Sequence, residues 1–252
     1  MITIKSAREI ETMAAAGRIL ADTLALVASR VEPGVSTGQL DDLAEEYIRS
    51  HPGARPSFKG LYDFPKSLCT SLNDEIVHGI PSPARVLRDG DILSVDCGVC
   101  LEGLHADSAT TVPVGEISRE TERLLRVTRE ALEAGIRAAV VGNHVGDIGH
   151  AVIGASFHEE PQIPNFGQPK RGPRLVAGMT LAIEPMVNAG GHEIKTLSDR
   201  WTIATADGSI SAHFEHTVVI EAQGTRILTS ALQEMAGGVN GGCVESRRSN
   251  HE

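Results

Sequence analysis

Residues 92–114, ILSVDCGVCLEGLHADSATTVPV, decide the fold because they have the pattern of a β-hairpin yet carry an acid within each of its apolar runs. Asp96 lies in the first apolar run, and Asp107 follows at the distance expected for the returning strand. Two later apolar runs also hold one acid each, Glu184 in MTLAIEPMV and Glu215 in AHFEHTVVI. An ionised side chain removed from water costs several kcal/mol. No Lys or Arg adjoins these acids, so each needs a compensating charge from elsewhere.

Together the four carboxylates carry a formal charge of minus four, which two divalent cations would neutralise. Taken singly, each acid could instead form an ion pair with a distant Arg or lie exposed at a strand end. A run of unrelated buried ion pairs is energetically poor, however. The sequence therefore predicts a metal site.

Composition limits the other possibilities. The chain has 252 residues and 41% hydrophobic residues, enough for one large domain or two small ones. With 23 basic and 33 acidic residues and no basic cluster, it has no evident nucleic-acid surface. No leader-like segment or apolar run of about 18 residues occurs, so we expect a cytoplasmic protein without a membrane segment. Cys97 and Cys100 form a lone CxxC, expected to be buried thiols in a reducing compartment.

Capping signals and apolar periodicity predict the helices. Ser6 with Glu9 predicts a helix that runs to about Val31, and Ser36 with Gln39 predicts a second one. A third is expected from about residue 118 to residue 141, and a fourth begins at residues 146–147.

The strands are predicted in two blocks, each following a pair of helices. They fall within residues 58–112 and then in residues 179–187, 201–205 and 213–220. The order of a pair of helices followed by strands occurs twice, which predicts an α+β domain of two similar halves. We expect the four acids to gather where the two halves meet. We expect this domain to cover residues 1–233 and a disordered tail to cover residues 234–252, which lack apolar periodicity.

The flanks of the acids closely resemble a known family. SVDCGVCLEGLHADSATT, IVHGIP, FHEEPQIPNFG, GMTLAIEPMV and DRWTIATADGSISAHFEHTVVI match the bacterial-type (type I) methionine aminopeptidases of peptidase family M24, over roughly residues 5–230. The resemblance implies the pita-bread fold, with two pseudo-symmetric halves around a central antiparallel sheet. It also implies a two-metal hydrolase that removes the initiator methionine from nascent polypeptides.

The resemblance assigns roles to the acids. Asp96, Asp107, Glu184 and Glu215 are expected to be ligands of two divalent ions, which could be cobalt, manganese, iron or zinc, with Asp107 and Glu215 bridging them. Such a pair of ions activates water for attack on the first peptide bond. Glu184 is expected also to collect the proton of that water.

Further residues are expected to contact the substrate. His78 in VHGIP and His158 in FHEEP match the family's two non-ligand histidines, which contact the substrate amide and the tetrahedral intermediate. An apolar, sulfur-tolerant pocket suits a methionine side chain, although each candidate could be plain core. The pocket positions match Phe64, Cys69, Phe157 and Trp201. The loop GLYDFP departs from the family pattern, with Leu61 where Tyr is common and Tyr62 where His is common.

The pattern breaks between DIGHAV and IGASFHEEP. There the family has the end of a helix and a strand leading to GHGIG, whose His is the sole nitrogen ligand of the metal pair. In this chain the ligand position falls on Ala151, and His150 is one residue out of register, so that only a local shift could bring it to the metal. We therefore predict a truncated second half and impaired or absent turnover.

Three alternatives stay open, two of them for the gap and one for the kind of enzyme. The gap could be a sequencing error, and the native protein then an ordinary aminopeptidase. The chain could instead be a catalytically dead relative that binds peptide or protein termini. It could also be another pita-bread hydrolase such as an X-Pro dipeptidase, against which Cys69, Trp201 and the short N-terminal part argue. The expected partners are the N-termini of nascent polypeptides, including those at the ribosome, and the expected state is a monomer.

Overall fold

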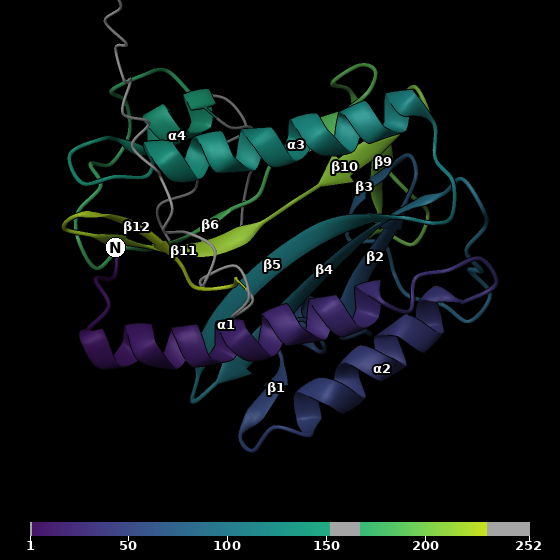
Figure 1. Cartoon of the computed structure of the whole chain (residues 1–252), viewed down its shortest axis with the longest axis horizontal. Coiled ribbons are helices and arrows are strands. Elements are labelled where there is room, and N and C mark those ends of the chain that lie inside the picture. The colour runs from purple at the N-terminus through teal and green to yellow at the C-terminus, as the bar shows by residue number, and fades with distance from the viewer. Residues whose placement is uncertain (1, 152–166, 231–252) are drawn as a thin grey trace, which may run out of the picture.

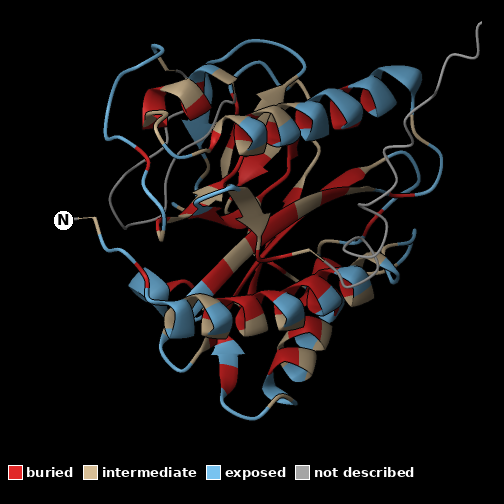
Figure 2. Cartoon of the chain, turned by 60° about the vertical axis from the view of Figure 1, so that its left-hand side comes forward, coloured by how far each residue is buried: buried red, intermediate tan, exposed pale blue. Residues whose placement is uncertain are grey.

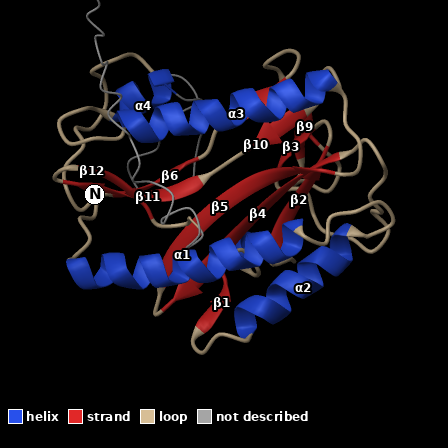
Figure 3. Ribbon diagram, viewed as in Figure 1, coloured by secondary structure: helices blue, strands red, loops and turns tan. Residues whose placement is uncertain are grey.

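A computed structural model of the chain describes residues 2–151 and 167–230. Its strands lie between two pairs of helices, α1 and α2 on one side and α3 and α4 on the other (Figures 1 and 3). The helices are α1 (Ala7–Ala28), α2 (Thr37–Arg49), α3 (Arg119–Ala138) and α4 (Val145–Ala151), with a short 3-10 turn η1 (Leu61–Asp63). None of the helices in the described residues is both long and apolar enough to cross a membrane.

All strand pairs are antiparallel. In the first half, β4 pairs with β5 along one edge and with β1 and β2 along the other. In the second half, β11 lies between β6 and β12, and β7 pairs with β10. The strands are β1 (Ala54–Pro56), β2 (Leu68–Leu72), β3 (Glu75–Val77), β4 (Ile92–Leu101), β5 (Leu104–Pro113), β6 (Thr180–Ile183), β7 (Met186–Asn188), β8 (Ile194–Thr196), β9 (Ile203–Thr205), β10 (Ser211–His213), β11 (His216–Glu221) and β12 (Gly224–Ile227).

The helix starts agree with the sequence signals. Both predicted capping boxes form, Ser6 with Glu9 and Ser36 with Gln39, and each satisfies backbone N–H groups at the helix start. The first helix ends earlier than predicted, at Ala28, because Ser29 already caps it. The inner faces of the helices are buried against the strands and their outer faces are exposed (Figure 2).

The β4–β5 hairpin sets the position of the first two acids. Its two-residue turn, Glu102–Gly103, has positive φ at both positions (49° and 82°), as a type I′ turn requires. The resulting register places Asp96 opposite Ala109 and Gly98 opposite Asp107. The two aspartates are therefore diagonal neighbours on one face of the sheet.

The two glutamates lie at breaks between strands, which corrects the prediction that residues 179–187 and 213–220 are continuous strands. The first break follows β6 at Glu184–Pro185, and the second follows β10 at Phe214–Glu215. Because Pro185 lacks an N–H, the ladder cannot continue through it. Ile183 pairs with His216 and Met186 pairs with His213, so the two breaks face each other.

Side-chain hydroxyls join the two halves. Asp107 donates its backbone N–H to Thr217 Oγ1 (2.8 Å), and Ser108 Oγ donates to the Glu215 carbonyl (2.6 Å). Thr111 Oγ1 accepts from the His213 N–H (2.9 Å) and donates to the His213 carbonyl (2.8 Å). These bonds place β5 beside the second break.

Each half has its own core. One cluster joins α1 and α2 to β4 and β5, and another joins α3 and α4 to β6 and β11. The predicted division into residues 1–233 and 234–252 stays a prediction, because the tail lies outside the described residues.

Candidate metal centre

The structure brings all four predicted acids together from four separate segments. Within the described residues, single ligand atoms of Asp96, Asp107 and Glu215 lie within 4.8 Å of one another. Ligand atoms of Glu184, His213 and Glu215 form a second group within the same distance. Glu215 is common to both groups. The segments are β4, β5 and the breaks after β6 and β10, so the cluster lies where the two halves meet.

Several buried polar atoms of this cluster have no hydrogen-bond partner among the described residues. They are Asp96 Oδ1, Asp107 Oδ1, both carboxylate oxygens of Glu215 and both ring nitrogens of His213. Buried polar atoms are normally satisfied, and each one left unpaired costs about 1–3 kcal/mol. Oxygen and imidazole donors gathered without partners fit a divalent metal ion.

Burial and mutual repulsion act on the acids. Burial raises the pKa of Asp96 and Asp107 well above the usual range, and the neighbouring carboxylates raise them further. Burial and the charges of Asp107, Glu184 and Asp96 do the same to Glu215. Burial raises the pKa of Glu184 to about 7. Four carboxylates held this closely are stable as anions only if cations compensate them.

His213 is a member of the cluster that the sequence analysis missed. It is the last residue of β10, is 1% exposed, and lies two positions before Glu215. Burial, with a smaller effect from the charge of His78, lowers the pKa of its imidazole to about 3, so the ring is neutral. The available signal was this spacing of two, which places side chains on the same side of an extended chain.

His78 lies in a backbone segment whose conformation is set by close packing. Its φ is 61°, an uncommon value for a non-glycine residue. The next residue, Gly79, packs so closely on β2 that a Cβ there would overlap the Thr70 carbonyl oxygen. Gly79 donates to Ser71 Oγ (3.2 Å) and accepts from the Thr70 N–H (2.7 Å). The segment after β3 is thereby fixed against β2.

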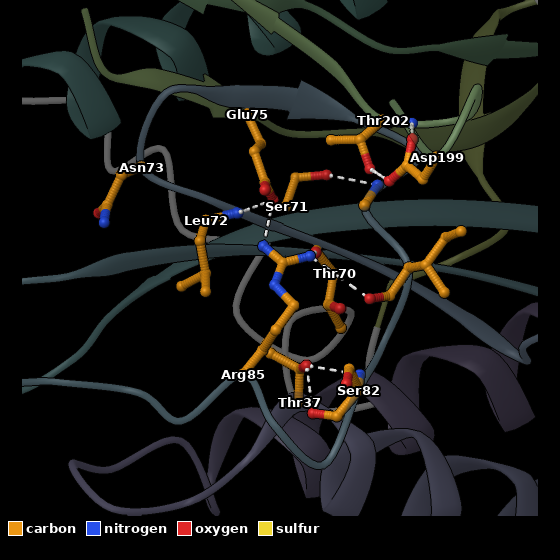
Figure 4. A network of polar contacts seen from close by, with 12 residues as sticks. Thr37, Thr70, Ser71, Leu72, Asn73, Glu75, Ser82, Arg85, Asp199 and Thr202 are labelled. Atoms are coloured by element: carbon orange, nitrogen blue, oxygen red, sulfur yellow. Dashed lines mark hydrogen bonds and ion pairs between the residues drawn. The ribbon is translucent and has the colours of Figure 1, made fainter. Parts of the chain in front are cut away.

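A polar network around Arg85 also holds this part of the chain (Figure 4). Arg85 forms an ion pair with Glu75, whose carboxylate also accepts from the Leu72 N–H (2.9 Å). The Arg85 guanidinium further donates to the carbonyls of Thr70 and Ile80, both at 3.4 Å. The segment that carries His78 is thus held by several hydrogen bonds. The charge of His78 contributes to the lowered pKa of His213.

Three of the predicted pocket residues meet in one apolar cluster. Phe64, Cys69 and Trp201 pack together with Phe58 and Ile80. The rings of Phe64 and Trp201 are edge to face, with centroids 5.1 Å apart. Cys69 lies directly opposite Asp96 in the β2–β4 pair, so this cluster adjoins the acids.

Of the remaining residues that the sequence analysis singled out, those that the structure describes do not belong to either ligand group. His150 lies on the exposed side of α4 and belongs to neither ligand group. Ala151 is the last residue of the same helix that the structure describes. Leu61 and Tyr62, where the chain departs from the family pattern, are exposed (37% and 64%). His158 and Phe157 lie outside the described residues.

The chain matches known proteins over most of its length. The model of "Metallopeptidase family M24" matches residues 11–153 and 149–222. The chain belongs to metallopeptidase family M24, in its methionine aminopeptidase branch. The methionine aminopeptidase of Clostridium perfringens is 50% identical, over 91% of this chain and 99% of its own length. Methionine aminopeptidase 1 of Bacillus subtilis is 48% identical, with the same coverage.

Solved structures of the family confirm the predicted pita-bread fold. The methionine aminopeptidase of Thermotoga maritima superimposes with a TM-score of 0.88 at 40% identity and covers 91% of this chain and 100% of its own. That of Rickettsia prowazekii gives 0.87 at 36% identity with the same coverage. The prolidase of Pyrococcus furiosus, at 18% identity and a TM-score of 0.71, shares the fold alone. The chain thus has the fold of the methionine aminopeptidases over 91% of its length.

Proposed function

We propose that this chain is a metal-dependent aminopeptidase that removes the initiator methionine from nascent polypeptides. The observation that carries the proposal is the adjacency of two clusters, the unsatisfied carboxylates and the apolar group of Phe64, Cys69 and Trp201. One supplies a metal site and the other a wall suited to a thioether. Relatives named methionine aminopeptidase support the same function.

In the proposed centre, two divalent ions supply Lewis acidity and lower the pKa of water to near neutral. Asp96, Asp107, Glu184 and Glu215 would hold these ions. The presence of Glu215 in both ligand groups supports a shared role for Glu215, while the proposed shared role of Asp107 rests on the resemblance to the family. Cobalt, manganese, iron and zinc all suit such ligands. The Glu184 carboxylate is proposed to collect the proton released by water.

The proposed role of His78 and His158 is to contact the substrate amide and the oxygen on which charge develops. For His78 the support is its rigid backbone segment, because hydrogen-bond donors that need no reorganisation stabilise a developing charge most effectively. For His158 the support is the FHEEP motif. Phe157 is proposed to join Phe64, Cys69 and Trp201 around the methionine side chain.

The proposal includes a cytoplasmic location and nascent-chain N-termini, including those at the ribosome, as partners. We also propose that the chain acts as a monomer and has no nucleic-acid surface. No helix in the described residues is long and apolar enough to cross a membrane. The excess of 33 acidic over 23 basic residues supports the lack of a nucleic-acid surface.

We further propose that turnover is impaired because a segment of the second half is missing. The family model matches in two pieces that meet at residues 149–153. The alignment with the Clostridium relative has 248 positions but takes in only 91% of this 252-residue chain, so part of the relative has no counterpart.

The test measures methionine release from a Met-Ala-Ser peptide by the chain loaded with Co²⁺ or Mn²⁺. A Bacillus subtilis enzyme assayed in parallel sets the normal rate. We expect this chain to release methionine much more slowly than the Bacillus subtilis enzyme. Inserting after residue 151 the segment that the Bacillus subtilis enzyme has and this chain lacks should make release faster. The same insertion with its ligand His replaced by Ala is the control, and an Xaa-Pro dipeptide tests the prolidase alternative.

Each result discriminates between the alternatives. A normal rate for the 252-residue chain refutes the impairment and leaves the function intact. Metal and peptide binding without cleavage, even after insertion, supports a non-catalytic binder of peptide termini. Preference for the Xaa-Pro substrate supports the dipeptidase.

A further inference from the structure

We infer that Nε2 of His213 is the nitrogen ligand of this metal centre, in place of the histidine that the chain lacks at Ala151. The inference deepens the proposed function and rests on it. It concerns the group made by Glu184, His213 and Glu215, whose ligand atoms lie within 4.8 Å of one another.

The distance between His213 and Glu184 has the value expected for two ligands of one ion. His213 Nε2 lies 3.8 Å from Glu184 Oε2, which is too long for a hydrogen bond. Ligand atoms at about 2.0–2.2 Å from a common ion lie about 3–4 Å from each other. A metal ion between the two side chains therefore needs little movement of either.

The imidazole makes no hydrogen bond within the described residues. Both of its nitrogens are buried and lack a hydrogen-bond partner there. Histidine nitrogens that are buried in this way are normally bonded to protein or water. Metal ligation satisfies one of them.

The backbone of His213 is fixed on both sides. Thr111 Oγ1 accepts from its N–H at 2.9 Å and donates to its carbonyl at 2.8 Å. β10 also pairs with β7, where His213 lies opposite Met186. The backbone that carries the ring is therefore fixed, and the ring itself is buried (1% exposed), which lowers the entropic cost of ligation.

The ligand set agrees with known coordination chemistry. Two carboxylates and one imidazole are a set that divalent metals accept, with positions left open for water and substrate. A neutral imidazole leaves the balance of four carboxylates against two divalent ions unchanged. The other group, Asp96, Asp107 and Glu215, supplies oxygen only, so the nitrogen belongs to one ion of the pair.

Two neighbouring histidines serve as matched comparisons. His216 is three residues further along, and its Nδ1 is hydrogen-bonded to Thr229 Oγ1 at 2.8 Å. His150, the sequence-based candidate, is exposed on α4. Neither belongs to a ligand group within the described residues.

The test is X-ray absorption spectroscopy and calorimetric metal titration on the full chain loaded with Co²⁺, without reference to turnover. We expect imidazole scattering in the wild type, its loss in His213→Gln, and its retention in His216→Gln and His150→Gln. We also expect His213→Gln to weaken binding of one ion about tenfold or more and to leave the other ion bound, since even indirect partners of a metal change affinity by about 10–100-fold. Circular dichroism checks folding, and His213→Asn replaces the Gln variant if that one fails to fold.

Three results would overturn the inference in distinguishable ways. Imidazole scattering that persists in the folded His213 variant, or disappears in His150→Gln, assigns the nitrogen to another residue. Two bound ions without any imidazole scattering in the wild type refute the role of His213 and leave the proposed function intact. A wild-type chain that binds no Co²⁺ refutes both.

Discussion

Cys69 of β2 lies directly opposite Asp96 of β4, and this pair connects the apolar cluster to the acids. Burial raises the pKa of the Cys69 thiol, and the charges of Asp96 and Asp107 raise it further, so the thiol stays neutral. One side of the sheet therefore presents an uncharged sulfur next to aromatic rings, immediately beside the carboxylates. The proposed pocket for the methionine side chain and the proposed metal site are therefore neighbours.

The first prediction concerns Trp201, whose ring packs against Phe64. Trp201→Leu is expected to weaken binding of a Met-Ala-Ser peptide to the metal-loaded protein about tenfold, because aromatic contacts of this kind contribute about 0.5–1.5 kcal/mol beyond area burial. Calorimetry measures the dissociation constant. Tyr62→Leu, at a residue that is 64% exposed, is the control and should bind normally. Equal losses in the two variants would contradict the pocket.

The second prediction concerns the crowded carboxylates. In metal-free protein at pH 7, Glu215→Gln is expected to raise the melting temperature, because it removes a buried charge whose pKa is raised by burial and neighbouring acids. The same variant should lose most of the stabilisation by added Mn²⁺, which for the wild type reaches about 2.7 kcal/mol at a hundredfold excess over the dissociation constant.

Thermal melts with and without Mn²⁺ and chelator measure both effects. Glu193→Gln, at an exposed position, is the control and should behave like the wild type. A lower melting temperature for metal-free Glu215→Gln, with a full response to Mn²⁺, would show that Glu215 is a structural residue and not a ligand.

Much of this architecture could be predicted from the sequence, since capping boxes and alternating apolar residues are local signals. The starts of α1 and α2 at Ser6 and Ser36 are examples. The convergence of Asp96 and Asp107 also followed from one hairpin and its turn. The breaks at Glu184 and Glu215 could not be predicted in this way. They depend on two segments that are distant in the sequence and whose pairing is interrupted at facing positions. His213 was missed for a related reason: its spacing of two from Glu215 is a weak local signal, and its membership of a ligand group depends on neighbours that are distant in the sequence.

The third prediction concerns Asp41, a buried acid of α2 that is 1% exposed. Its Oδ1 accepts from the backbone N–H groups of Ser67 and Leu68, both at 2.8 Å, and its Oδ2 lies 3.1 Å from Lys66 Nζ. Asp41→Ala leaves these two N–H groups unsatisfied at the start of β2, so we expect a loss of about 2–4 kcal/mol in the free energy of unfolding. Urea denaturation measures the loss.

Asp42→Ala is the matched control, because Asp42 is the next residue of the same helix and is exposed. Its unfolding free energy should change by less than about 0.5 kcal/mol. Equal losses in the two variants would show that helix propensity, and not the bonds to β2, sets the cost. Because Asp41 holds the strand that carries Cys69, its loss should also weaken peptide binding.

The last prediction concerns pH and Glu45, a half-buried acid in α2. Burial alone raises its pKa, but hydrogen bonds from Lys59, Arg49 and Ser67 outweigh this and lower it to about 2, from an ordinary value of 4.5. The three donors lie at 2.6, 2.8 and 3.0 Å. Because the folded pKa is the lower one, the stabilisation by Glu45 is fully present above about 4.5 and is lost as the pH falls towards about 2.

Urea denaturation of the wild type and of Glu45→Gln across this range measures the difference. The wild type should be more stable than the variant at pH 6, and the gap should narrow steadily below pH 4.5. Glu46→Gln, at the exposed neighbouring residue, should follow the wild-type curve throughout. A gap between wild type and Glu45→Gln that does not change with pH would mean that Glu45 acts through packing, since only its ionised carboxylate accepts all three hydrogen bonds and attracts both cations.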